Sequence, residues 1–185
     1  MERLLAGSAR HNRFLFDDAL HLLDVMDGVR IIVEIGAIRD ARPVAQPADG
    51  WSTVSWASSR HRVFTVDVDG RAILTTNRLL TQINGILPSN CRLHTGDGCL
   101  FLQDFKEEID LLYLDGPDPH EMGQKWAADA ISAALPKMSA SALILFDDCD
   151  FSDGGKGKYA MKVAGSNGYT LIHDTTRQKL LRRMS

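Results

Sequence analysis

The chain has 185 residues, of which 44% are hydrophobic and 24% are charged, and its formal net charge at pH 7 is -3. This length suits one domain with a sizeable buried core, and the composition is that of an ordinary globular protein. The small negative charge argues against the strongly basic surface that is typical of nucleic-acid-binding domains.

The cysteines and the apolar runs indicate in which cellular compartment the protein is expected. Cys91, Cys99 and Cys149 have no CxxC spacing and an odd count, which argues against a disulfide framework and a structural zinc site. The N-terminus lacks the continuous apolar segment of a signal peptide, and no apolar run is long enough to span a bilayer. We therefore expect a cytoplasmic protein with no membrane partner. A basic cluster over residues 177–183 is interpreted as a solvated strand or helix.

The first third of the chain contains a helix, a strand and a long loop. Residues 1–28 form an N-terminal segment with an amphipathic helix expected over about 10–26. The apolar, β-branched residues 29–36 are typical of a central parallel strand. Residues 37–50 contain two prolines, several charges and a glycine, and predict a loop that is long for such a connection. A helix is expected over residues 51–60.

Strands and helices alternate through the rest of the chain. Further strands are expected at residues 62–70, 91–98, 109–114, 142–146, 169–174 and 178–184. Helices are expected at residues 71–83, 119–135 and 158–164, with a short one ending at Phe105. The alternation predicts a single domain over residues 1–185, of the α/β class. Its sheet should be doubly wound, mostly parallel and seven-stranded, with helices on both faces as in Rossmann-like folds.

Two of the predicted strands end abruptly in carboxylates. Asp115 follows residues 109–114, and Asp147 with Asp148 follows residues 142–146. Because ligands of open α/β sheets bind outside the carboxyl ends of the strands, these acids should converge at one edge of the sheet. Such a cluster suggests a metal site or a site that handles protons. Alternatively, Asp115 caps a turn and the other two are solvated loop acids.

Five short motifs, taken together in their order and spacing, resemble those of the class I S-adenosylmethionine-dependent methyltransferases, and particularly the small-molecule O-methyltransferases with a metal site. They are VEIG at 33–36, VDVDG at 66–70, GDG at 96–98, IDLLYLDG at 109–116 and ALILFDD at 142–148. The resemblance covers roughly residues 29–184. One departure follows Gly36, where the compact glycine-rich turn of the family is replaced. We interpret residues 37–50 as an insertion in this cofactor loop.

The resemblance implies that S-adenosylmethionine binds at the ends of the first three strands. The expected cofactor-binding residues are Glu34, Gly36, Asp67, Asp97 and Gly98. Asp67 would accept hydrogen bonds from the ribose hydroxyls, with Asp69 as the less favoured alternative. Glu34 and Gly36 would let the cofactor approach the backbone, and Asp97 would meet the adenine amino group. Asp67 or Asp97 could instead be a helix N-cap.

The resemblance also implies a divalent cation bound by Asp115, Asp147 and Asp148, with magnesium as the expected ion. Hard oxygen ligands suit such ions, and a cation on the acceptor oxygen would lower the pKa of a hydroxyl that is otherwise protonated at neutral pH. Relatives often carry Asn at the last position. Asp148 adds a negative charge there, which would strengthen binding of a divalent ion or, without metal, raise the pKa of one acid.

The candidate catalytic residues are Asp115, His120 and Lys156. His120 has an ordinary pKa suited to a general base, with Asp118 as a further candidate, although a lone His in a proline-containing loop is often an exposed turn residue. Lys156 lies in GGKGK and could close over the site on its glycine hinges, or be a solvated lysine at a helix start.

These residues predict a methyltransferase that transfers a methyl group from S-adenosylmethionine to a hydroxyl of a small molecule, assisted by a divalent cation. No nucleic-acid partner is expected. The N-terminal helix and the insertion would shape the acceptor pocket or a contact in a homodimer. The alternative is a non-catalytic S-adenosylmethionine-binding subunit that acts through a partner protein. A nicotinamide-dependent oxidoreductase is disfavoured, because GAIRDA after the first strand is not GxGxxG.

Overall fold

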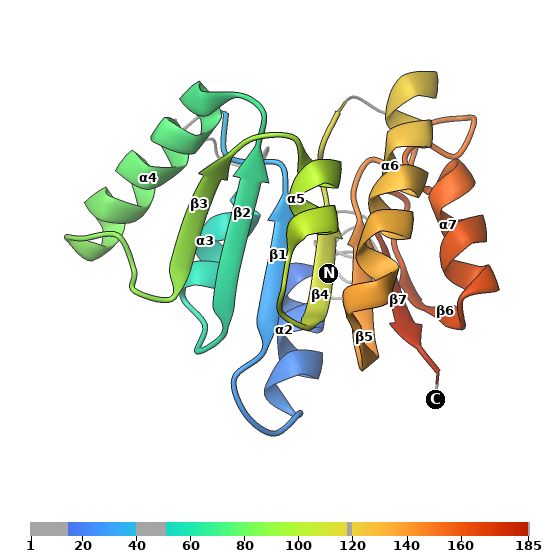
Figure 1. The fold of residues 1–185 in the computed structure, drawn as a ribbon, viewed down its shortest axis with the longest axis horizontal. Helices are drawn as coiled ribbons and strands as arrows, with labels where there is room; N and C mark the ends of the chain where they lie inside the picture. The colour runs from blue at the N-terminus through green and yellow to red at the C-terminus, as the bar shows by residue number, and fades with distance from the viewer. Residues whose placement is uncertain (1–14, 40–50, 118–119, 185) are drawn as a thin grey trace, which may run out of the picture.

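The protein is built on one seven-stranded sheet (Figure 1). The computed structural model describes residues 15–39, 51–117 and 120–184. The strand order is β3-β2-β1-β4-β5-β7-β6. The strands are β1 Ile31–Ile35, β2 Arg62–Asp67, β3 Cys91–Thr95, β4 Ile109–Leu114, β5 Met138–Phe146, β6 Tyr169–Asp174 and β7 Lys179–Arg183. The five strands β1 to β5 pair in parallel, whereas β7 is antiparallel to both β5 and β6. The predicted doubly wound, mostly parallel fold is confirmed.

Helices cover both faces of the sheet. The helices are α2 Phe16–Asp24, α3 Ser52–Ala57, α4 Gly70–Asn84, α5 Gly98–Asp104, α6 Glu121–Ala134 and α7 Gly157–Ser166, with a 3₁₀ turn at Leu135–Lys137. In Figure 1, α5, α6 and α7 lie in front of the sheet, and α2 and α3 lie behind it. This arrangement explains why the residues of β4 are apolar except Asp110, since both faces of that strand are buried.

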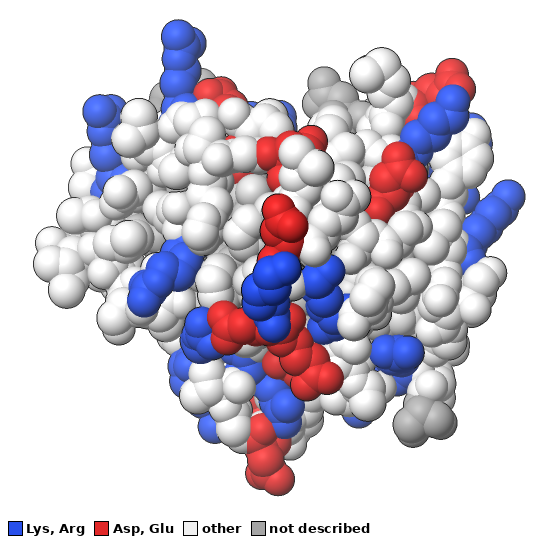
Figure 2. Space-filling model, viewed as in Figure 1, with Lys and Arg blue, Asp and Glu red and all other residues white. Residues whose placement is uncertain are grey.

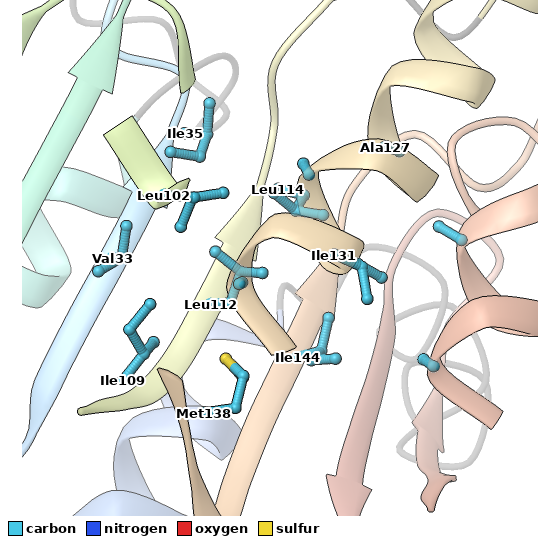
Figure 3. Close-up of a cluster of buried hydrophobic side chains, with 14 of the residues drawn as sticks. Val33, Ile35, Leu102, Ile109, Leu112, Leu114, Ala127, Ile131, Met138 and Ile144 are labelled. Carbon is cyan, nitrogen blue, oxygen red and sulfur yellow. The ribbon is translucent and has the colours of Figure 1, made fainter. Parts of the chain in front are cut away.

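Successive side chains of β1 enter different cores, because neighbouring residues of a strand point to opposite faces. Ile32 packs in a cluster with Leu23 of α2 and Trp56 of α3. Val33 packs in the other cluster, against α5 and α6 (Figure 3). The alternation fixes which residues near the end of β1 can face a site at the carboxyl edge.

The element boundaries differ from the predictions at several places. The strand β5 begins at Met138, four residues before the predicted start at residue 142. The strand β2 ends at Asp67 rather than at residue 70, because Asp69 caps α4 by accepting a hydrogen bond from the Arg71 amide. Residues 1–14 and 40–50 lie outside the described residues, so the predicted roles of the N-terminal segment and of the insertion stay predictions.

The surface carries charges of both signs. On the face drawn in Figure 2, basic and acidic side chains are interspersed. One pair joins Arg62 and Glu107, and another joins Lys125 and Glu121 at 2.7 Å. Exposed pairs of this kind each contribute little to stability, so the two buried cores carry most of it. Among the residues that the structure describes, no helix is long and apolar enough to cross a membrane.

Candidate active site

A pocket of about 210 Å³ opens at the carboxyl ends of β1, β2 and β3. Its lining combines glycines, two acids, one arginine and apolar side chains: Ile35, Gly36, Arg39, Val66, Asp67, Val68, Gly96, Asp97, Gly98, Gly116, Pro117 and Trp126. Four of the five predicted cofactor residues therefore lie in one pocket. Arg39, Val68 and Trp126 also line the pocket, and the sequence pattern did not predict them; Val68 is a large apolar side chain with 70% of its surface accessible.

Two glycines make the pocket possible. Gly36 has a φ of 114°, which disfavours other residues, and a Cβ built there would lie 2.2 Å from the Asp115 carbonyl oxygen. A Cβ built on Gly98 would lie 2.5 Å from Cγ2 of Ile35. The chain thus brings the ends of β1 and β4 and the start of α5 closer together than side chains would allow. Backbone atoms are thereby exposed to a ligand.

Asp67 is held firmly while its carboxylate keeps spare acceptor capacity. The side chain is 7% exposed. Its Oδ2 accepts a hydrogen bond from the Ala37 amide at 2.9 Å, and Oδ1 accepts one from the Asp69 amide at 2.8 Å. Each carboxylate oxygen has a second lone pair. Asp67 can therefore accept from a diol in the pocket, whereas Asp69 is occupied as the N-cap of α4.

Asp97 combines two of the roles considered from the sequence. It is the N-cap of α5, where its Oδ1 accepts a hydrogen bond from the Leu100 amide at 2.9 Å. It also lines the pocket, next to Gly98. Val68 and Trp126 supply apolar surface in the same pocket, which suits a flat heterocycle. The assignment of Asp97 to an adenine edge stays a prediction.

Glu34 is not among the residues that line the pocket, and its assignment as a cofactor contact stays a prediction. Its fully buried carboxyl accepts hydrogen bonds from the hydroxyls of Ser52, Thr53 and Thr65 and from Nε1 of Trp56. The next residue along β1 faces the pocket, and strand alternation turns Glu34 to the opposite side. Burial raises the pKa of Glu34 to about 7, although the hydroxyl donors act to lower it. Glu34 therefore ties β1 and β2 to α3.

The second group of acids converges as expected, at the ends of β4 and β5, but around a lysine. Nζ of Lys156 lies 3.0 Å from Oδ1 of Asp115 and 2.8 Å from Oδ2 of Asp148. Lys156 itself is only 1% exposed. We call Asp115, Asp147 and Asp148 the acid cluster. Its partners come from the loop before α7 and from the turn between β6 and β7.

Asp147 is the most enclosed member of the acid cluster, at 2% exposure. Its Oδ1 lies 2.6 Å from Nε of Arg177, and its Oδ2 accepts hydrogen bonds from Tyr113 Oη at 2.8 Å and Gln178 Nε2 at 3.1 Å. Arg177 also reaches Oδ1 of Asp148, at 3.2 Å. The sequence pattern placed Arg177 in a solvated basic cluster, whereas the antiparallel pairing of β7 with β5 brings it to this edge.

The pKa values separate the possible proton carriers. Burial alone would lower the pKa of the Lys156 ammonium, but the charges and hydrogen bonds of Asp115 and Asp148 outweigh it and raise that pKa above its usual value. Lys156 is therefore an ammonium at neutral pH and cannot act as a general base. Burial raises the pKa of Asp115 to about 6, against the charge of Lys156, which acts to lower it. Asp115 is mostly ionised at pH 7.

His120 is not brought to the acid cluster. It stands at the N-cap position of α6, exposed to solvent, and its side chain makes no capping hydrogen bond. Asp118 lies outside the described residues. The geometry thus leaves Asp115 as the catalytic candidate with supporting contacts, and the role of His120 stays a prediction.

The acid cluster does not fit the predicted divalent cation. Within residues 15–39, 51–117 and 120–184, no group of three or more His, Cys, Asp or Glu side chains is arranged to hold a metal ion. Asp115 and Asp148 direct oxygens at the Lys156 ammonium, and both oxygens of Asp147 are bonded to Arg177, Tyr113 or Gln178. Among the described residues, every oxygen of the acid cluster except Oδ2 of Asp115 already has a cationic or hydrogen-bonding partner.

Comparisons with known proteins bear on the family and the fold of the chain. A family model described as a methyltransferase domain matches residues 48–149. Among solved structures, one from Staphylococcus aureus is described as a putative caffeoyl-CoA O-methyltransferase. Its sequence is 15% identical to that of this chain, and the two structures superpose with a TM-score of 0.66 over 93% of this chain and 84% of the other. An O-methyltransferase from Bacillus cereus, in complex with SAH, is 16% identical in sequence and superposes with a TM-score of 0.63 over 99% of this chain and 88% of the other. No curated protein matches the chain.

Proposed function

The chain belongs to the methyltransferase-domain family, as a class I S-adenosylmethionine-dependent methyltransferase, and we propose that it transfers the methyl group to a hydroxyl of a small molecule. S-adenosylmethionine supplies a methyl group on a sulfonium, whose sulfur keeps the bonding electron pair when the methyl leaves. The residues of the chain must then bind the two reactants, align them and accept the hydroxyl proton.

The pocket at β1, β2 and β3 has the parts that such a cofactor needs. Asp67 offers carboxylate lone pairs to a ribose diol, and the glycine backbone at Gly36 and Gly98 leaves room for close approach. Arg39 contributes a positive charge to the lining, which suits the carboxylate of an amino acid end. The residues present therefore fit S-adenosylmethionine.

One observation carries the proposal of a hydroxyl acceptor, namely the free oxygen of Asp115. Oδ1 accepts a hydrogen bond from Lys156, while Oδ2 has no partner among the described residues. The residue lies beside the pocket, since its amide donates to the Ile35 carbonyl and the next residues, Gly116 and Pro117, line the pocket. A pKa of about 6 leaves this carboxylate ionised and able to take a hydroxyl proton at neutral pH.

In the proposed step, an acceptor hydroxyl donates a hydrogen bond to Oδ2 of Asp115. The new bond forms between the acceptor oxygen and the methyl carbon, the proton passes to Asp115, and solvent later removes it. Lys156 holds Asp115 through Oδ1, so that Oδ2 keeps one direction. The divalent cation expected from the sequence has no part in this step, because the acid cluster does not fit one.

The test is methyl transfer by the purified chain from S-adenosylmethionine with a labelled methyl group. A panel of phenols, aliphatic alcohols, amines and thiols of similar size would serve as acceptors. We expect label on oxygen and none on nitrogen or sulfur. Transfer to amines alone would contradict the hydroxyl assignment, and tight cofactor binding without transfer to any acceptor would favour a non-catalytic subunit.

A further inference from the structure

The acid cluster contains two internal cations in place of one metal ion. Lys156 joins the ends of β4 and β5 through Asp115 and Asp148, and Arg177 joins Asp147 to Asp148. Two single positive charges equal the charge of one divalent ion. The cluster therefore has the same net charge, minus one, as three carboxylates around a divalent cation would have.

The position of the ammonium leaves no place for a metal. A divalent ion binds carboxylate oxygens at about 2.0–2.6 Å and needs to touch several of them at once. Nζ of Lys156 already stands between the nearest oxygens of Asp115 and Asp148, at 3.0 and 2.8 Å. Both could be bonded to a metal only if the buried lysine left its site, which would strand an ammonium in a nearly solvent-free environment.

The backbone around Lys156 is shaped to deliver this side chain. Gly154 and Gly155 have φ angles of 95° and 50°. A Cβ built on Gly155 would lie 1.9 Å from the Asp148 carbonyl oxygen, and the Lys156 amide donates to that same oxygen at 3.2 Å. Asp148 is itself in the left-handed region, with a φ of 50°. Two turns with left-handed backbone thus fold against each other and bring Lys156 to the cluster.

We propose that Lys156 takes the place of a divalent cation in the acid cluster, so that the wild-type protein binds no metal there and loss of this side chain turns Asp115 and Asp148 into a divalent-cation site. Lys156 acts as a positioning residue, since it reaches the reaction only through Asp115. A buried ammonium offers no open coordination position. If the proposed hydroxyl methylation holds, the acceptor therefore needs one hydroxyl and no second oxygen to chelate an ion.

The test is a calorimetric titration of the full chain with Mn²⁺ alone, without cofactor or acceptor. Wild type should show no saturable binding up to about 1 mM, the weak end of protein sites for hard cations. Lys156→Ala should bind one Mn²⁺ at least about tenfold more tightly than that limit. Lys158→Ala is the matched control, because Lys158 is a neighbouring, partly exposed lysine whose ion pair with Asp153 is long, at 3.6 Å. It should behave like wild type.

Two results would overturn the proposal. One is saturable Mn²⁺ binding by wild type that Asp115→Asn or Asp148→Asn abolishes. The other is a folded Lys156→Ala variant that binds no more Mn²⁺ than Lys158→Ala does. If the alanine variant fails to fold, Lys156→Gln replaces it. Saturable Mn²⁺ binding at the acid cluster of wild type would overturn the proposal whichever variant is used. Because no methyl transfer is measured, failure of the proposed function leaves this result unaffected.

Discussion

The two halves of the carboxyl edge use the same residue type in different ways. At β2, Asp67 is held by two backbone amides and keeps lone pairs for a ligand. At β4 and β5, Lys156 and Arg177 pair with the acid cluster, and Oδ2 of Asp115 is left without a partner among the described residues. An acid at a strand end can therefore be a ligand-binding group, a structural group or a base, depending on what else reaches it.

The two halves also differ in which part of the chain supplies the partners of their acids. The amides that hold Asp67 belong to Asp69, two residues on, and to Ala37 on the adjoining strand end. The cations of the acid cluster come from the loop before α7 and from the β6–β7 turn, 41 and 30 residues from Asp115 and Asp147. The partners of Asp67 come from its own turn and from the end of the neighbouring strand β1, whereas those of the acid cluster depend on how the C-terminal part of the chain folds back.

The sharpest test of the second half is Asp115→Asn. Loss of a general base should lower kcat by about 10²- to 10⁴-fold, while affinity for S-adenosylhomocysteine stays unchanged. Because the base must be ionised, wild-type kcat should rise with pH and level off above the Asp115 pKa of about 6. The variant should lack that rise. Asp150→Asn, an exposed acid on the same loop, is the control. If kcat rose with pH in Asp115→Asn as it does in Asp150→Asn, Asp115 would not be the base.

Glu34→Gln tests the claim that this carboxyl is structural. Between its ordinary pKa of 4.5 and its folded pKa of about 7, the folded protein keeps a proton on Glu34 that the unfolded chain has released. Stability should therefore fall by about 3 kcal/mol as pH rises through this window. In the variant this contribution should be absent, as measured by denaturant unfolding at several pH values. Glu108 is exposed, so Glu108→Gln should keep the wild-type dependence of unfolding free energy on pH. If Glu34→Gln kept it as well, Glu34 would not be the buried structural carboxyl described above.

Arg177→Ala tests whether the acid cluster needs its second cation. The substitution leaves the nearly buried Asp147 without its charged partner and should lower the free energy of unfolding by about 2–3 kcal/mol. Arg60→Ala removes an exposed pair with Asp24, at 3.4 Å, and should cost no more than about 1 kcal/mol. Equal losses in denaturant unfolding would show that Arg177 is an ordinary surface residue.

Much of the fold could be predicted from the sequence, because strands buried on both faces produce continuous apolar runs such as ALILF at the end of β5. The convergence of acids at one edge followed from the same parallel order. The alternation of side chains along β1 places Glu34 on the face opposite to Ile35, which lines the pocket. The buried position of Glu34 could therefore be predicted from strand geometry alone.

The partners of the acid cluster could not be predicted in the same way. Lys156 reaches Asp115 and Asp148 through the left-handed turn at Gly154 and Gly155. The two glycines in the sequence predict a turn, but they do not predict where that turn directs the lysine side chain. Arg177 reaches Asp147 because β7 pairs antiparallel with β5. A metal site and a lysine-bridged cluster share the same three acids, so the difference lies in residues far along the chain.

The most direct test of the contrast between the two halves is one calorimetric comparison with S-adenosylhomocysteine. Asp67→Asn and Asp148→Asn make the same chemical change at two strand ends. If Asp67 binds the ribose and Asp148 belongs to the lysine-bridged cluster, only Asp67→Asn should weaken binding, by about 10- to 100-fold, the value of one or two hydrogen bonds to a charged group. Equal losses in the two variants, or no loss in Asp67→Asn, would contradict the account.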